Sequence, residues 1–190
     1  MRRLLLLAVS IVSLAIPGLA FAGGGDYTFD GGTKAQHGHV RAALGASTFN
    51  WNAVPTRVTI HIQPNIPTQA TPGHIWLDAG LVDSGRFAWA TIQDEYAHQV
   101  DFSRFNAMTR TRLTGELGAR DWCYGVSGLQ HGEYGCERFA STLVWAFWPS
   151  KHNAYRPTSS SDESAAMAPQ QFRTLVTGLL GMSNPFATTR

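Results

Sequence analysis

The side chains best suited to chemistry lie in one short segment, residues 93–102, which holds several ionisable groups close together. Asp94 and His98 are four positions apart, so on an α-helix both project from one face and can bind the same metal ion. Glu95 lies about 100° further round such a helix, beside the open position of the metal, where it could accept a proton from a bound water. Zinc would suit this reaction, because it lowers the pKa of a bound water toward ~7 and polarises a carbonyl oxygen.

The sequence D-E-Y-A-H at residues 94–98 resembles the HExxH signature of the zincins, a large group of zinc metallopeptidases. It also resembles the extended form HExxHxxD that several zincins have. The chain matches at Glu95, His98 and Asp101, and it departs at the first position, where the family has His and this chain has Asp94. The resemblance implies that Glu95 is the general base and that His98 and Asp94 are metal ligands.

In the gluzincin branch of this family, a Glu on a later helix supplies the third ligand. Glu137 resembles that residue, because it lies 39 positions after His98 and begins an apolar helix expected over residues 137–148. The resemblance therefore implies a zinc centre made of Asp94, His98 and Glu137. It also implies an α+β, zincin-like fold, in which a small β-sheet packs on the active-site helix and further helices follow toward the C-terminus. The implied function is an exported zinc-dependent hydrolase, a peptidase acting on a peptide or protein substrate.

Other interpretations of these residues stay open. Asp94 has a short side chain, and two carboxylates partly cancel the charge of an ion, so the centre could be active, weakly active or without metal. Asp94 and His98 could be an ordinary i,i+4 pair, and Glu137 occupies a first helical turn, where the helix dipole favours any carboxylate. The alternative function is a non-catalytic extracytoplasmic binding protein on a degenerate zincin scaffold. The missing first His and aromatic loop residues such as Trp122 and Tyr124 favour it.

A peptidase of this kind also needs a group that stabilises the developing oxyanion. His131, Tyr134 and Tyr155 are candidates, because they lie close in sequence to the expected helix over 137–148. Asp101 could orient the histidine ligand through a hydrogen bond, or it could cap a neighbouring backbone amide. The sequence alone does not separate these two roles.

Four further histidines are assigned to structure rather than to chemistry. His37 and His39 form an H-x-H pair, which we interpret as part of a solvated helix start. His61 and His74 lie on or beside expected strands, and we interpret them as edge residues whose ring nitrogens are satisfied locally.

Hydrophobic periodicity predicts the elements that position these residues. Alternation of polar and apolar residues predicts strands over 57–62 and 74–78. A loop with three prolines over 64–73, a turn over 79–84 and a flexible Gly-rich lead-in over 23–32 are expected between and before them. Spacings of three and four predict helices over 35–46, 85–105, 109–117, 137–148 and 169–180. The helix over 85–105 is apolar on two sides, so it is expected in the interior, where its ionisable groups need partners.

Cys123 and Cys136 are the two cysteines of the chain, thirteen positions apart. In an exported protein a disulfide between them is expected, and it would stabilise the fold by roughly 3 kcal/mol in the loop-entropy model. No second pair of Cys or His lies at ligand spacing around them, which speaks against a zinc site built on these cysteines.

Residues 1–22 have the layout of a secretory signal peptide, with two arginines, an apolar run over 4–16 and an A-x-A site ending at Ala22. The run is shorter than the ~20 residues of a membrane span, so no stable anchor is expected after cleavage. The remaining residues 23–190 are expected to form one secreted or extracytoplasmic domain. In them thirteen Lys and Arg balance thirteen Asp and Glu, which speaks against binding to nucleic acid. The sequence does not set the oligomeric state.

Overall fold

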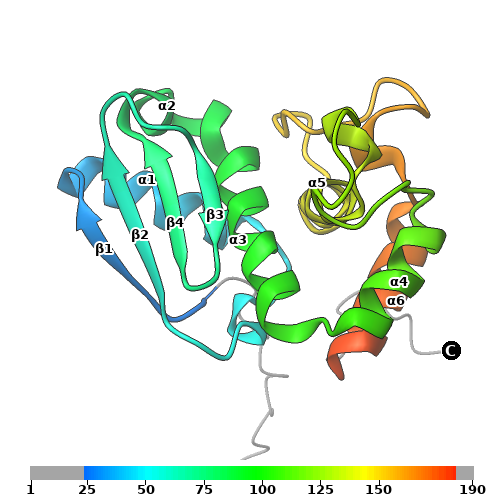
Figure 1. Ribbon diagram of the computed structural model, residues 1–190. Coiled ribbons are helices and arrows are strands. Elements are labelled where there is room, and N and C mark those ends of the chain that lie inside the picture. Colours follow the sequence, from blue (N-terminus) through cyan, green and yellow to red (C-terminus); the bar gives the residue numbers. More distant parts are fainter. Residues whose placement is uncertain (1–23, 183–190) are drawn as a thin grey trace, which may run out of the picture.

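The computed structural model describes residues 24–182 and places them in an α+β fold (Figure 1). A four-stranded mixed sheet lies at one side, and six α-helices of the described region pack against it and against one another. The expected α+β class is therefore confirmed. The signal peptide expected over residues 1–22 lies outside the described residues. Within residues 24–182, no helix has the length and apolar character needed to cross a membrane.

The sheet consists of β1 (Tyr27–Gly31), β2 (Val58–Gln63), β3 (Gln69–Thr71) and β4 (His74–Asp78). The strand order is β1-β2-β4-β3, with β1, β2 and β4 parallel and β3 antiparallel to β4 at one edge. In β2 the residues Val58, Ile60 and Ile62 are buried and their neighbours are not, as the alternating pattern predicts. The apolar face of the sheet carries α1 and α3, whereas the other face is turned to the viewer in Figure 1 with no helix over it.

Two strands correct the expectations from the sequence. β1 lies where a flexible lead-in is expected over residues 23–32, and that prediction is wrong, because Tyr27 and Phe29 pack against the core and the strand pairs with β2. β3 lies inside the segment 64–73, for which a loop is expected. β1 forms through pairing with residues far along the chain, and β3 has only three residues, so local periodicity reports neither of them.

The longer helices are α1 (Lys34–Ala46), α3 (Trp89–Arg104), α4 (Ala107–Glu116), α5 (Gly135–Phe147) and α6 (Pro169–Leu180). They lie close to the five predicted ranges. The expected turn over 79–84 instead contains the short helix α2 (Ala79–Asp83), whose N-terminus is capped by Asp78: the backbone N–H of Leu81 donates to its Oδ1 at 2.9 Å. Four short 3₁₀ helices complete the described chain: η1 (Trp51–Ala53), η2 (Gly85–Ala88), η3 (His131–Glu133) and η4 (Glu163–Ala165).

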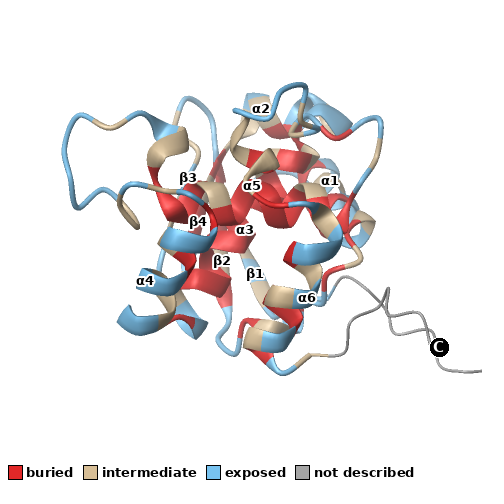
Figure 2. Ribbon diagram, turned by 90° about the vertical axis from the view of Figure 1, so that its right-hand side faces the viewer, coloured by how far each residue is buried: buried red, intermediate tan, exposed pale blue. Residues whose placement is uncertain are grey.

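Helix α3 lies at the centre of the molecule, between α1 on the side of the sheet and α5 on the other side (Figure 1). Its residues from Ile92 to Asp101 are all buried, and they appear as a red stretch in Figure 2. The predicted interior position of this helix is therefore confirmed. Its acidic and histidine side chains in this stretch, Asp94, Glu95, His98 and Asp101, are all buried with it.

Gln99 of α3 fastens the edge of the sheet to the helix. Its Oε1 accepts the backbone N–H of Gly73 at 2.8 Å, and its Nε2 donates to the carbonyl oxygens of Thr71 at 2.9 Å and His74 at 3.0 Å. These residues form the turn between β3 and β4, in which Gly73 has a φ of +81°. The turn and α3 are thus held together by one buried side chain.

The expected disulfide between Cys123 and Cys136 is present, with its Cα atoms 5.5 Å apart. It closes the loop before α5 against the first turn of that helix. Arg138 adds two hydrogen bonds of 2.7 Å, one from Nε to the carbonyl of Gly132 and one from Nη1 to the carbonyl of Leu117. The loop is therefore attached to α5 at several points.

Candidate metal centre

The packing of α3 against α5 brings His98 and Glu137 together. His98 lies in the third turn of α3 and Glu137 in the first turn of α5, and both are buried. His98 Nε2 is 3.3 Å from Glu137 Oε2 and 3.8 Å from Asp94 Oδ2. The three residues that the resemblance implies as ligands are therefore neighbours, with His98 between the two carboxylates.

Three residues, His98, Cys136 and Glu137, bring possible ligand atoms together. One ligand atom from each lies within 4.8 Å of the other two, and all three residues are buried, so this group could hold a metal ion. Cys136, however, is bonded to Cys123, and a disulfide sulfur lacks the thiolate charge that binds metals. His98 and Glu137 are thus the two residues of the group whose side chains can bind an ion, His98 only through a deprotonated ring nitrogen.

Asp94 carries the atom that most needs a partner. Its Oδ1 is buried and has no hydrogen-bond partner in the described part of the chain. Burial raises the pKa of Asp94 well above its usual range, although the charge of His98 acts in the opposite direction. A buried, unpartnered carboxyl oxygen is costly unless a proton or a cation satisfies it. Asp94 lies beside His98 but is not one of the three residues whose ligand atoms converge, and its raised pKa lets a proton satisfy this oxygen.

Glu95 is a buried carboxyl group with a raised pKa. Burial raises its pKa to about 7, with the charge of His98 opposing the shift and that of Glu137 adding to it. A carboxyl group with such a pKa can accept and release a proton near neutral pH. Glu95 lines the same cavity as Asp94, His98 and Glu137.

His98 and Glu137 stabilise each other as an ion pair. Burial alone would lower the pKa of His98, but the hydrogen bond with Glu137 and the nearby charges of Asp94, Glu137 and Glu95 raise it to about 9. Burial would likewise raise the pKa of Glu137, but hydrogen bonds with His131 and His98 hold it far below its usual range. Glu137 is therefore an ionised carboxylate at neutral pH.

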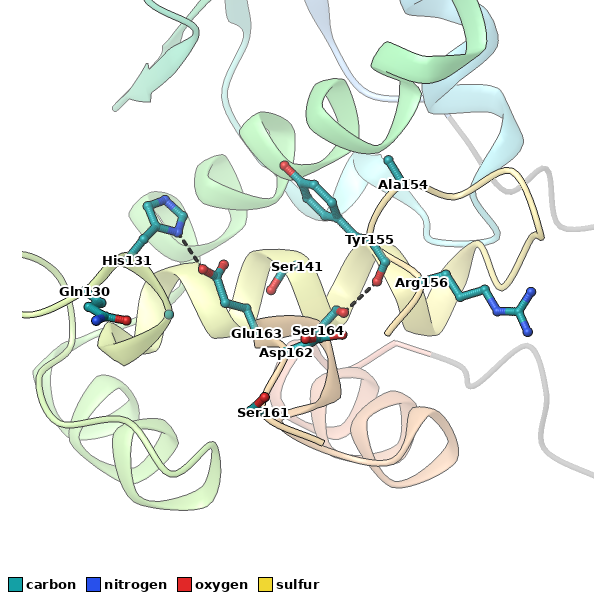
Figure 3. A pocket seen from close by; sticks show the side chains of 11 residues that line it. Gln130, His131, Ser141, Ala154, Tyr155, Arg156, Ser161, Asp162, Glu163 and Ser164 are labelled. Carbon is teal, nitrogen blue, oxygen red and sulfur yellow. Dashed lines mark hydrogen bonds and ion pairs between the residues drawn. The ribbon is translucent and has the colours of Figure 1, made fainter. Parts of the chain in front are cut away.

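His131, one of the predicted oxyanion candidates, lies between two carboxylates. Its Nε2 is 3.1 Å from Glu137 Oε2, and its Nδ1 is 2.9 Å from Glu163 Oε1, the contact drawn in Figure 3. These two hydrogen bonds raise the pKa of His131 to about 10, so the ring is positively charged at neutral pH. Because its side chain is 60% exposed, it combines a fixed orientation with access to a bound molecule.

Tyr124 contacts the site although sequence analysis assigns it no catalytic role. Its hydroxyl donates to Glu137 Oε1 at 2.8 Å. Its backbone has a φ of +56°, a left-handed conformation that is costly for a tyrosine, so the surrounding loop must hold it there. The adjacent disulfide at Cys123 supplies that constraint. No local sequence signal identifies this contact.

A cavity of about 560 Å³ opens over these side chains. One wall is the edge of the sheet, residues 68–72, which include β3. The other walls come from α3, from the loop that carries Tyr124 and His131, and from Tyr155. A second cavity of about 550 Å³, shown in Figure 3, shares His131 and Tyr155 with the first. The two cavities therefore adjoin at these two residues.

Two of the predicted residues point elsewhere. The Oδ1 and Oδ2 of Asp101 accept hydrogen bonds from Arg110 Nε at 2.9 Å and Trp122 Nε1 at 3.1 Å. Asp101 thus joins α3 to α4 and to the loop before α5. The hydroxyl of Tyr134 donates to the carbonyl of Val126 at 2.7 Å, within its own loop. Neither residue lines the cavity.

Comparisons with protein-family models, with curated proteins and with solved structures find no match to this chain.

Proposed function

We propose that this chain is an exported zinc-dependent hydrolase of zincin type that cleaves peptide bonds. One observation carries the proposal: His98 and Glu137, from two different helices, meet at 3.3 Å in a cavity that Glu95 also lines. This is the arrangement that the resemblance to the HExxH…E pattern implies. Residues 23–190 would act as one extracytoplasmic domain after removal of residues 1–22.

The edge of the sheet supports a peptide as substrate. β3 is the last strand of the sheet, so one side of its backbone has no partner strand in the described chain. Residues 68–72, which contain this strand, line the cavity. An extended peptide could add to this edge through main-chain hydrogen bonds, which would carry its scissile bond past Glu95.

Each residue of the cavity would have a separate role in metal binding or catalysis. His98, Glu137 and Asp94 would hold the zinc ion, which supplies Lewis acidity and lowers the pKa of a water molecule. Glu95, with its pKa of about 7, would accept the proton of that water and deliver it to the leaving amine. Tyr124 donates to Glu137 Oε1 and fixes its orientation. His131, charged at neutral pH, would stabilise the developing oxyanion.

A specific observation favours the alternative, a non-catalytic peptide-binding module on a degenerate zincin scaffold. Both oxygens of Glu137 have partners in the chain itself: Tyr124 at Oε1, and the two histidines His98 and His131 at Oε2. The positive rings of these histidines balance the carboxylate without a metal ion. In this alternative the cavity binds a peptide but does not cleave it.

Zinc analysis with matched variants tests the proposal. The purified mature protein, stripped of metal and reconstituted with Zn²⁺, should retain about one zinc per chain, and less than about one zinc per ten chains would refute it. Glu95→Gln should keep the zinc and lose peptide hydrolysis by at least about 100-fold. Glu116→Gln, a matched change on α4, should alter neither property.

The variant Asp94→His distinguishes the zinc hydrolase from the non-catalytic binding module. If Asp94 is a working ligand, this change should lower activity or leave it no higher than in the wild type. If the scaffold is degenerate, restoring the histidine of the HExxH pattern should raise zinc affinity and create peptidase activity in a protein that had none. Activity should be measured on a mixture of unstructured peptides, because the cleavage preference is not assumed.

A further inference from the structure

The open face of the sheet carries a second group of ring nitrogens, on different elements from the candidate metal centre. Asp30 of β1 is paired in register with His61 of β2, and His61 is paired with Trp76 of β4. His74 lies two residues before Trp76 on the same strand and so on the same face. The alternating residues of β2 and β4, which include Ile60 and Ile75, are buried on the opposite face.

These side chains form a continuous chain of contacts. His61 Nδ1 is 2.7 Å from Asp30 Oδ2, and His61 Nε2 is 3.0 Å from His74 Nδ1. The carboxylate can only accept, so Nδ1 of His61 carries a proton, and in the neutral ring Nε2 presents a lone pair toward His74. A proton on His74 Nδ1 completes the contact as a hydrogen bond. If His74 carries its proton on Nε2 instead, two lone pairs face the same point.

We propose that His61 Nε2 and His74 Nδ1 form a binding site for a divalent transition-metal ion, with Cu²⁺ bound most tightly. Two ligands at about 2.0 to 2.1 Å from an ion, at angles of about 90° to 109°, lie about 2.8 to 3.4 Å apart. The observed separation of 3.0 Å falls in this range. Imidazole nitrogen suits copper, nickel and zinc, and copper stands highest in the general order of affinity.

The neighbours of His61 fix its tautomer and ring orientation in a way that favours metal binding. Metal-binding histidines commonly donate their second ring nitrogen to a carboxylate, which fixes the tautomer and raises the basicity of the ligand nitrogen. Asp30 provides this contact. The ring of Trp76 stacks on His61 with centroids 5.0 Å apart and planes 12° from parallel, which restricts rotation of the imidazole. The His61 side chain is only 15% exposed, but His74 is exposed, so water can reach the site from the side of His74 and complete the coordination.

The test is a Cu²⁺ titration of the full mature chain, followed by electron paramagnetic resonance and by tryptophan fluorescence. Wild-type protein should show copper bound to imidazole nitrogen and quenching of Trp76. His74→Gln, a change at an exposed position, should weaken binding at least about tenfold, and Asp30→Asn should weaken it by about tenfold through loss of the orienting contact. Trp76→Phe should keep the resonance signal and lose that part of the quenching.

Two control variants make the result decisive. His152→Gln, at another exposed histidine, should change copper affinity by less than about twofold. His98→Ala should also leave this copper site unchanged, because the residue belongs to the buried centre. The proposal is overturned if His74→Gln binds Cu²⁺ as tightly as wild type, or if copper is lost in His98→Ala and kept in His74→Gln.

Discussion

Replacing Gln99 with leucine should detach the edge of the sheet from helix α3. Gln99 is 2% exposed and makes three hydrogen bonds, to the amide of Gly73 and to the carbonyls of Thr71 and His74. Leucine fills similar space but can neither accept nor donate. At about 0.5 to 1.5 kcal/mol for each bond, the three together contribute about 3 kcal/mol. We expect the free energy of unfolding to fall by about that amount, with the denaturant slope unchanged.

Urea denaturation followed by tryptophan fluorescence would measure this loss, and amide hydrogen exchange would locate it. The amide of Gly73 donates to Gln99, so its exchange should accelerate far more than that of amides in β2. Gln171→Leu, the same change at an exposed position of α6, should cost less than about 0.5 kcal/mol. A loss for Gln99→Leu no greater than for Gln171→Leu would refute the reasoning.

Gln99→Glu tests whether the hydrogen bond accepted by Oε1 or the two bonds donated by Nε2 stabilise the fold. The carboxylate can still accept the amide of Gly73, but it places negative charge against the carbonyl oxygens of Thr71 and His74. The cost should therefore be at least as large as that of leucine. Wild-type stability in this variant would mean that the two donated bonds contribute nothing.

Two further predictions concern the disulfide and a helix cap. Changing Cys123 and Cys136 together to serine should lower the free energy of unfolding by about 3 kcal/mol, because the bridge joins residues thirteen apart. Urea denaturation would measure this loss. A loss under about 1 kcal/mol would mean that other bonds hold the loop. The pKa of Asp78 is lowered because the backbone N–H of Leu81 donates to its carboxylate. The ionised carboxylate therefore stabilises the fold above the unfolded-state pKa of about 4, and this stabilisation is lost as the pH falls through the lower folded-state value. The stability difference between wild type and Asp78→Ala should thus be larger at about pH 7 than at about pH 3, and equal differences would contradict this assignment.

The helices could be predicted closely because their own residues mark their ends. α6 begins with Pro169 at the first helical position and ends before Gly181, which has a φ of +64°. The edge strands carry no comparable signal. β1 forms by pairing Tyr27 with Val58, and β3 is three residues long, so both depend on partners that a local pattern does not contain.

The residues of the candidate site that belong to a local sequence pattern could be predicted, and those placed by tertiary packing could not. The HExxH-like pattern and the apolar helix after Glu137 identify a pair that the fold brings to 3.3 Å. His131 gains its two carboxylate partners, Glu137 and Glu163, only through tertiary packing, since these lie 26 positions apart. Tyr124 has no signal at all, because a left-handed residue in a glycine-containing loop gives no indication of where its hydroxyl lies.

The positions of the two cysteines link the maturation of the site to thiol oxidation. Cys123 directly precedes Tyr124 and Cys136 directly precedes Glu137, the two residues joined by a 2.8 Å hydrogen bond. Formation of the bridge therefore brings donor and acceptor together in the same event. A chain kept reduced would still join this loop to α5 through the hydrogen bonds of Arg138, but it would lose the covalent link next to Tyr124. The hydrogen bond between Tyr124 and Glu137 should therefore be weaker in a reducing compartment than in an oxidising one.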